Sequence, residues 1–346
     1  MSRLMGESFA RSWAAKRAQV NGEAREGGGA HASPLFDARV TTADNPGMDR
    51  LFDRALHDVH RRRALAAAAA GADFLLRAAV DDLVERLSAV NRRFAVALDL
   101  ATPAPLLADR LAAAGIAERV VRIDSLPEAL GDGPYVRVVG DAERLPFAAE
   151  SFDLVVSALA LHWLNDLPGA LVQVRRALKS DGLFLAVLPG TDTLTELKSA
   201  LALAETEIRG GIAPRVAPFA ELRDLGGLLQ RAGFALPVAD QDRLTVRYDS
   251  VLDLMRDLRA MGAANALVER DRRPLRRDML ARAAAIYRER YADPDGRLRA
   301  TFDFVSLSGW APDESQQRPL RPGSAKARLA DALGTVERSA GEKAGR

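Results

Sequence analysis

Cysteine is absent from the whole chain of 346 residues. Its absence excludes disulfides, thiolate metal sites and cysteine nucleophiles, and it suits a reducing compartment, so we expect a cytoplasmic protein. No apolar run approaches the roughly 18 residues that a membrane-spanning helix needs. The longest run of alanines covers only Ala66–Ala70. Any contact with a membrane is therefore expected to be peripheral.

The chain also has almost no excess of one charge. It holds 49 basic and 47 acidic residues, which leaves a formal net charge of +2. This balance gives no global reason to expect a nucleic-acid partner, although a local basic face remains open. The 48% of hydrophobic and 28% of charged residues indicate a soluble protein with a sizeable core.

The two ends of the chain lack the apolar periodicity of folded segments. Residues 1–34 are rich in arginine, glycine, alanine and serine, so we expect a flexible tail there, and a second one over residues 331–346. A transit peptide is the alternative for the first tail, because its basic residues could lie along an amphipathic helix. Three glutamates in the same segment count against it. One domain is expected over residues 35–330.

The stretch from Ser151 to Gly190 predicts the fold class. Phe152–Ser157 and Leu183–Leu188 are short apolar runs typical of strands buried on both faces. Between them, Leu171, Val174 and Leu178 recur at helical spacing. Two parallel strands joined by one helix form a right-handed crossover unit. We therefore expect a doubly wound α/β sheet that binds ligands at the carboxyl ends of its strands.

Further strands and helices extend this sheet on both sides. Apolar runs predict strands over residues 94–100, 119–123, 135–139, 243–248 and 302–307. Helical patterns over residues 251–261 and 274–291 predict a helical cap, at about 251–295, inserted before the last strand. Thr193 and Glu196 have the spacing of a capping box, which predicts the start of a helix there.

Residues 48–65 predict an amphipathic helix before the sheet. Leu51, Ala55, Leu56 and Val59 form its apolar stripe, and charged residues occupy the rest of the helix. Asp53, His57 and His60 share another face, but a metal site would need a further ligand and a closed shell. We expect no metal, and a solvated face instead.

Three aspartates mark the ends of successive predicted strands: Asp99, Asp124 and Asp141. Acidic residues at the carboxyl ends of neighbouring parallel strands face one crevice, where they can accept hydrogen bonds from ribose hydroxyls or an adenine amino group. The alternative for each one taken alone is a loop cap, because aspartate is common in turns.

At this point the sequence resembles the class I S-adenosylmethionine-dependent methyltransferases. The matching motifs are LDL at 98–100, GDAERLPF at 140–147 and FDLVVS at 152–157. Segments such as LFDRAL at 51–56, GTDTL at 190–194 and ESQQRP at 314–319 make it most similar to the mitochondrial complex I assembly factor group and its bacterial relatives. The malonyl-carrier-protein methyltransferases of biotin synthesis come next. The resemblance implies a seven-stranded Rossmann-like sheet.

The resemblance also implies a cofactor, S-adenosylmethionine, and its binding residues. Asp99 stands where such enzymes fix the loop under the methionine part, and Asp124 where an acid receives the ribose hydroxyls. The other implied contacts are Ala101, Asp141, Ala142 and Ser157. His162 and Trp163 stand near the methyl group, but an aromatic pair there also suits the edge of a core. No catalytic residue is assigned.

The first loop departs from the family pattern. The family has glycines at three alternate positions, where this chain has Ala101, Pro103 and Pro105. Glycine allows the backbone to approach a ligand closely, whereas proline removes an N–H donor and restricts φ. Pro105 can be tolerated at the start of a helix, whereas Pro103 does not stand at such a position. We therefore expect a cofactor site that is weakened or lost.

The function implied by the resemblance is S-adenosylmethionine-dependent chemistry on a protein or carrier-protein substrate, linked to assembly of respiratory complex I. The assembly-factor group is also associated with arginine hydroxylation. The rival hypothesis is a non-catalytic binding protein that keeps the fold, since fold alone does not imply chemistry. A dinucleotide oxidoreductase ranks third, because the glycine fingerprint is missing.

One surface suggests a partner. Met255, Leu258, Met261 and Ala264 share a helix face, and an arginine-rich loop follows them at Arg270, Arg272, Arg273, Arg276 and Arg277. An apolar face beside an arginine cluster suits an acidic protein. The alternative is a solvated helix whose apolar side packs on the sheet.

Overall fold

The computed structural model describes residues 50–317, 330–331 and 334–336. Both predicted tails therefore lie largely outside the described residues. A seven-stranded sheet has the order β3-β2-β1-β4-β5-β7-β6, with β7 antiparallel to both its neighbours. The strands are β1 Phe94–Leu100, β2 Ala117–Asp124, β3 Val136–Val139, β4 Phe152–Ala158, β5 Leu178–Pro189, β6 Ala235–Tyr248 and β7 Leu298–Trp310.

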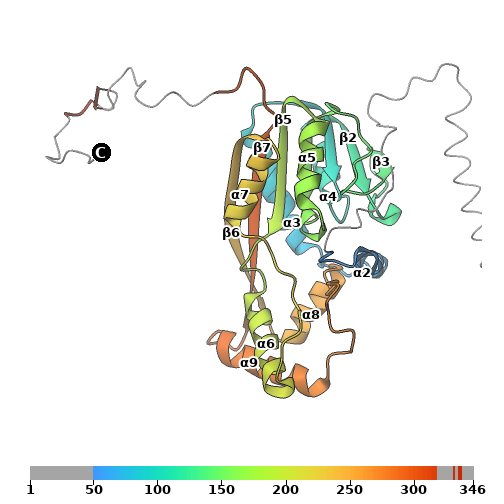
Figure 1. The fold of residues 1–346 in the computed structure, drawn as a ribbon, viewed down its shortest axis with the longest axis vertical. Coiled ribbons are helices and arrows are strands. Elements are labelled where there is room, and N and C mark those ends of the chain that lie inside the picture. Colours follow the sequence, from blue (N-terminus) through green and yellow to red (C-terminus); the bar gives the residue numbers. More distant parts are fainter. Residues whose placement is uncertain (1–49, 318–329, 332–333, 337–346) are drawn as a thin grey trace, which may run out of the picture.

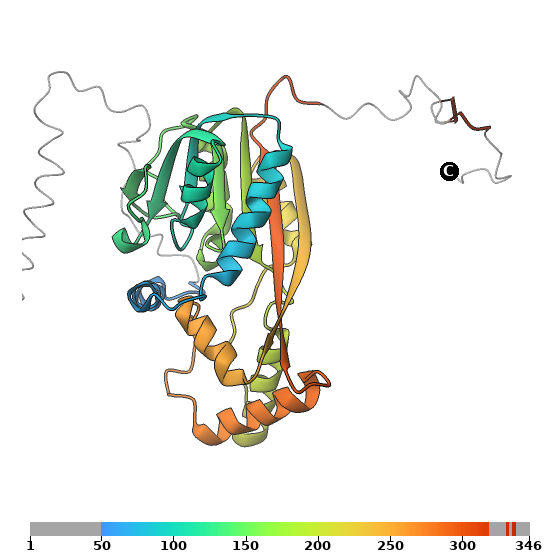
Figure 2. The same cartoon turned by 180° about the vertical axis from the view of Figure 1, so that it is seen from behind.

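Helices cover both faces of this sheet (Figures 1 and 2). Side chains of α3 and α4 belong to one apolar layer and those of α5 and α7 to the other. The α-helices are α2 Arg54–Ala67, α3 Phe74–Ala89, α4 Leu106–Ala113, α5 Leu167–Ala177, α6 Thr195–Arg209, α7 Leu222–Arg231, α8 Val251–Ala260 and α9 Arg277–Tyr291. Two 3₁₀ turns, η1 Pro127–Ala129 and η2 Leu161–Trp163, follow β2 and β4. None of the described helices has the length and apolar character to cross a bilayer.

The predicted crossover unit is confirmed. β4 and β5 pair in parallel through α5. The central strands are apolar throughout because both of their faces are covered, and β1 is exposed only at its second residue. The predicted doubly wound α/β fold is therefore correct, and every predicted strand lies at an observed one.

The cap differs from the prediction in its composition. β6 and β7 run past the other strands, and α6, α8 and α9 gather beyond them at one end of the molecule (Figure 1). Sequence analysis assigned only residues 251–295 to the cap, but α6, which precedes them in the chain, packs against α9. A second layer for the cap therefore comes from the segment that follows β5.

The predicted capping box is wrong. Helix α6 begins after Leu194, whose backbone is left-handed at φ 58°, and no side chain caps it. The Thr193 hydroxyl instead donates to the Asp303 carbonyl at 3.0 Å, and the Glu196 carboxylate accepts from the Thr301 N–H and hydroxyl at 3.1 and 2.6 Å. The two side chains tie α6 to β7, because a strand lies within reach that the local pattern could not reveal.

The expectation of a solvated face on α2 is also wrong. The helix forms where the pattern placed it, but none of its residues is buried, and Leu51 just before it is 44% exposed. The face directed at the domain instead carries Arg54, His57 and Arg61. The carboxylates of Asp141, just after β3, and Asp124, at the end of β2, accept hydrogen bonds from this face.

Candidate cofactor and substrate site

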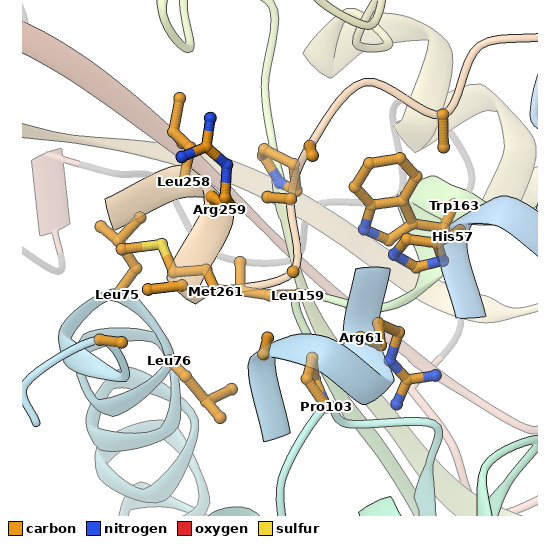
Figure 3. A pocket seen from close by; sticks show the side chains of 18 of the residues that line it. His57, Arg61, Leu75, Leu76, Pro103, Leu159, Trp163, Leu258, Arg259 and Met261 are labelled. Carbon is orange, nitrogen blue, oxygen red and sulfur yellow. The ribbon is translucent and has the colours of Figure 1, made fainter. Parts of the chain in front are cut away.

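A cavity of about 790 Å³ lies at the carboxyl ends of the strands, where the connections from β1 and β4 leave in opposite directions (Figure 3). This is the switch point at which open α/β sheets bind ligands. Its walls come from the loops after β1 and β4, from α2 and α3, and from the cap helices α6 and α8. The sheet and the cap thus share one cavity.

Strained backbone gathers around this cavity. Seven non-glycine residues among those described have positive φ, and four of them line it: Ala68, Ala101, Leu159 and Leu194. A left-handed conformation costs an L-residue roughly 1–2 kcal/mol, and such strain clusters at functional sites. Ala101 has φ 57°, at a position where the resemblance to the methyltransferases implies glycine. Its backbone therefore adopts a left-handed conformation that glycine adopts more readily.

Asp99 lies beneath this loop and does not line the cavity. Its carboxylate is fully buried and pairs with the equally buried Arg122. Arg122 in turn donates to the carbonyls of Thr102 and Ala129, which fixes the loop. Burial raises the pKa of Asp99, against the opposing effect of Arg122. Its Oδ1 atom has no hydrogen-bond partner among the described residues.

Ser157 is buried in the same layer. Its hydroxyl donates to the Leu100 carbonyl at 2.7 Å, and the next N–H, of Ala158, donates to the Thr102 hydroxyl at 3.2 Å. The side chain of Ser157 therefore joins β4 to the end of β1 and does not reach the cavity. Of the six predicted cofactor contacts, Ala101 and Ala142 are the two that line it directly.

Asp124 is covered by an arginine from α2. Arg61 donates to its two carboxylate oxygens at 3.1 and 2.6 Å, and the Leu126 N–H donates to Oδ1 at 2.8 Å. The Arg61 side chain is 10% exposed and that of Asp124 is fully buried. This is a bidentate, charge-assisted pair of the strong kind.

Asp141 is covered in the same way by a second arginine of α2. Arg54 donates to its two oxygens at 3.0 and 2.7 Å and also pairs with Glu143 at 3.0 Å. Burial would raise the pKa of Asp141, but the hydrogen bonds from Arg54 and from the Glu143 N–H outweigh it and lower that pKa. This pair is more open, with side chains 31% and 36% exposed.

The two prolines of the first loop have different roles. Pro105 has φ −70° and stands directly before α4, where a missing N–H has no intrahelical partner to lose. Pro103 lines the cavity (Figure 3). It therefore presents an apolar ring and no N–H donor to any ligand there.

An aromatic cluster closes the other side of the crevice. The His57 and Trp163 rings stack with centroids 3.9 Å apart, as Figure 3 shows, and His162 lies 5.1 Å from Trp163 and 6.1 Å from Phe219. Burial lowers the pKa of His162 to about 3 and, together with the charge of Arg61, that of His57 to about 2. Both imidazoles are therefore neutral at physiological pH.

Apolar side chains line the half of the cavity that faces the cap. They come from α3, from α6 and the residue before it, from α8 and the residue after it, and from β7: Leu75, Leu76, Leu194, Leu197, Leu201, Met255, Leu258, Met261, Phe302 and Phe304. Most arginines on the cavity wall pair with a carboxylate of the chain. Arg259 is the lining arginine for which the described residues hold no such partner. The half of the cavity that faces the cap is thus apolar, and Arg259 is its one cation without a carboxylate partner among the described residues.

The predicted partner surface is wrong in one respect. Met255, Leu258, Met261 and Ala264 line the internal cavity and do not form an exterior patch. Two arginines of the following loop are held within the chain, Arg270 by Asp53 at 3.2 Å and Arg276 by Asp278 at 2.5 Å. The apolar face packs inward because α8 buries Val251 and Leu254 in the core, and these side chains continue the same apolar cluster.

Asp53 also has a structural role. It caps α2 by accepting from the Leu56 N–H at 3.0 Å, while His57 stacks on Trp163. Within the described part of the chain, no three histidine or acidic side chains come together as a metal site would require.

Sequence analysis missed Arg54 and Arg61 as site residues. A signal was present, because a spacing of seven places both guanidinium groups on one helix face. That face continues through His57, Asp58, Ala64 and Leu65, all of which line the cavity. The pattern was overlooked because an arginine-rich face usually indicates a solvated one.

Comparison with known proteins agrees with this geometry. Residues 98–186 match the family described as a methyltransferase domain. The mitochondrial arginine-hydroxylase NDUFAF5 of Danio rerio is 40% identical over 264 residues, which cover 75% of this chain and 82% of that protein. The Homo sapiens protein of the same name is 42% identical over 261 residues, covering 73% and 74%.

A second group of relatives has another named activity. Malonyl-[acyl-carrier protein] O-methyltransferase of Halorhodospira halophila is 35% identical over 285 residues, which cover 79% of this chain and 93% of that protein. The expectation of a cytoplasmic location is wrong, because the NDUFAF5 relatives are mitochondrial proteins. Lack of cysteine was compatible with that location and could not exclude it. The chain belongs to the methyltransferase-domain family that contains arginine-hydroxylase NDUFAF5 and malonyl-[acyl-carrier protein] O-methyltransferase.

Proposed function

We propose that this chain binds S-adenosylmethionine at the carboxyl ends of β1, β2 and β4 and acts on a protein or carrier-protein substrate, linked to assembly of respiratory complex I. The observation that carries this proposal is one cavity, which joins the loop after β1 and the two arginines that cover Asp124 and Asp141 to an apolar chamber under the cap. A cofactor at the loop after β1 and a substrate group under the cap can meet in this cavity.

The residues fit this cofactor once the arginines of α2 are displaced. Asp124 would accept hydrogen bonds from the ribose hydroxyls, and Asp141 and Ala142 would flank the adenine. Ala101, with its left-handed backbone, keeps the turn under the methionine part. When bound, the cofactor supplies an electrophilic methyl group on sulfur. Transfer of that group depends on positioning more than on acid–base catalysis, so the lack of an assigned catalytic dyad does not oppose the proposal.

The substrate end is supported by the cap half of the cavity. Its leucine, methionine and phenylalanine side chains suit an apolar chain or the aliphatic part of a long side chain. The neutral His57 and His162 leave the aromatic cluster uncharged. Arg259 is available to an anionic group at the wall. The names of the relatives supply two substrate classes, an arginine side chain and a malonyl group on a carrier protein.

The first test is a calorimetric titration with S-adenosylmethionine. Because Pro103 removes a donor, we expect weak binding, with a dissociation constant near 1 mM, about −4 kcal/mol. The titration therefore needs millimolar ligand. Asp124→Asn should abolish the heat, since hydrogen bonds to a charged group contribute about 1.5–3 kcal/mol each.

Asp132→Asn is the matched control, because the side chain of Asp132 is 99% exposed and lies outside the cavity. Heat that persists unchanged in Asp124→Asn would show that Asp124 is a structural cap. A parent protein that gives neither heat nor a thermal shift at millimolar ligand would remove the cofactor proposal altogether.

The product distinguishes the substrate classes. Mass spectrometry of a mixture with the two candidate substrates would show one added oxygen atom for hydroxylation and one added methyl group for methylation.

A non-catalytic assembly protein is the second candidate. It is favoured by the arginines that cover Asp124 and Asp141 and by the prolines of the first loop. This candidate predicts that Asp124→Asn still supports complex I assembly in cells. Loss of assembly in that variant, with normal protein levels, would favour the enzyme.

A further inference from the structure

We propose that helix α2 is a latch over the cofactor crevice, and that Arg54 and Arg61 hold it shut by occupying Asp141 and Asp124. A bound cofactor would have to displace these arginines. The inference rests on the proposed cofactor function and adds a residue-level control of cofactor affinity.

The two arginines act together because of helix geometry. They are seven residues apart, almost two full turns, so they project from one face. The aspartates that they meet stand at the ends of β2 and just after β3, two strands that pair in parallel. Figures 1 and 2 both place α2 beneath these strand ends, beside the cap. One helix thus covers two neighbouring acids.

Asp124 cannot serve Arg61 and a ribose at the same time. Both of its oxygens already accept from Arg61, and Oδ1 also accepts from the Leu126 N–H. The carboxylate has no exposed surface while the Arg61 guanidinium covers it. A ribose hydroxyl can therefore reach this carboxylate only after Arg61 has left. The same competition at Asp141 is weaker, because that pair is about one-third exposed.

The attachment of α2 allows such a movement. None of its residues is fully buried, so its release exposes less apolar surface than release of a core helix such as α3 would. Its amino-terminal end is held, because the backbone of the buried Phe52 bonds to the Asn165 side chain at 2.8 and 3.2 Å. Its carboxyl-terminal end leads into the exposed alanines 66–70. We infer a swing about Phe52 that moves Arg61 more than Arg54.

The effect on cofactor affinity follows from the fraction of molecules in which α2 covers the crevice. When only one molecule in ten is open, the apparent dissociation constant is ten times the intrinsic one. Removal of the closing contact removes this factor. Arg61→Gln should therefore bind the cofactor about tenfold more tightly than the parent, whereas a residue that merely contacts the cofactor would bind it less tightly when replaced.

The experiment compares three variants by calorimetric titration with S-adenosylhomocysteine. Arg61→Gln should tighten binding about tenfold, and Arg54→Gln by a smaller factor. Arg62→Gln is the matched control, because this neighbour on the same helix lies 49% exposed with only a long contact of 3.5 Å to Glu128. It should bind as the parent does.

A second readout follows the helix itself. Because the chain lacks cysteine, Ala66→Cys gives one site for an environment-sensitive fluorophore near the free end of α2. In the parent, ligand should shift its emission. In Arg61→Gln, most of this shift should be present before ligand is added.

Two failures are distinguishable. Equal or weaker binding by Arg61→Gln, with binding still measurable in the parent, overturns the latch and leaves the cofactor function standing. Absence of binding in the parent and in every variant overturns the cofactor function and the latch with it. Tighter binding without any change of emission also overturns the latch, because the helix would then not have moved.

Discussion

Helices α2 and α3 follow each other in the chain and are attached in opposite ways. They have 14 and 16 residues, and α3 buries six apolar side chains against the sheet. Helix α2 buries none and is held by the Arg54 and Arg61 ion pairs and by the His57 ring on Trp163. Apolar burial has no substitute partner in water, whereas an arginine can exchange its carboxylate for solvent when a ligand takes its place. Helix α3 therefore belongs to the core and helix α2 to the site.

The largest difference should appear on truncation of a leucine in each helix. Leu83 of α3 is fully buried, so Leu83→Ala should lower the free energy of unfolding by about 2–5 kcal/mol. Leu65 of α2 is only half-buried, and Leu65→Ala should cost less than about 1 kcal/mol. Urea unfolding of both variants measures this contrast. Similar losses would mean that α2 is part of the cooperative core.

The second largest effect should come from acid, which should weaken the packing of His57 and His162 around Trp163. The folded-state pKa values of His57 and His162 lie at about 2 and about 3, below the ordinary value of 6.5. The neutral imidazoles therefore stabilise the fold fully above pH 6.5, and this stability is lost as the pH falls from 6.5 towards 3. A fully shifted histidine gives a slope of about 1.4 kcal/mol per pH unit.

Both rings are only half-buried, so solvent screening should leave the observed slope below that value. Free energies of unfolding measured between pH 7 and pH 5 give this slope. His162→Phe should flatten the dependence while keeping the ring contacts. A profile that stays equally steep in His57→Phe and in His162→Phe would assign the acid sensitivity to other groups.

The smallest effect concerns strained alanines. Ala101 and Ala68 both have left-handed backbone, in the loop under the crevice and at the end of α2. Replacement by glycine relieves a strain of about 1–2 kcal/mol in the folded state. It also stabilises the unfolded chain by roughly 0.5–1 kcal/mol, because glycine has more conformational entropy there. Ala101→Gly should therefore raise the free energy of unfolding by about 0.5–1 kcal/mol.

Ala68→Gly tests the same change on the latch. It should slow hydrogen exchange at the last turn of α2 and leave global unfolding unaltered, because α2 is held apart from the core. An equal gain in global stability from both substitutions would remove the distinction between the two helices.

Local pattern was enough to predict most of the framework. Strands β1 and β4 were predicted within one residue, since a short apolar run buried on both faces has a signal of its own. The strand-end acids and the position of α5 followed from the same patterns. All of these features depend on neighbours within about a dozen residues.

Tertiary structure alone decided what the side chains do. Arg61 and Asp124 are 63 residues apart, and Arg54 and Asp141 are 87 apart, so no local pattern links an acid to the arginine that covers it. Thr193 and Glu196 bind β7, more than 100 residues away, instead of capping their own helix. The sequence by itself determined the sheet and the place of the crevice, because these depend on periodicity. Only the folded chain decided that the crevice is covered by its own arginines, because a charged face turns towards whichever opposite charges the fold brings near.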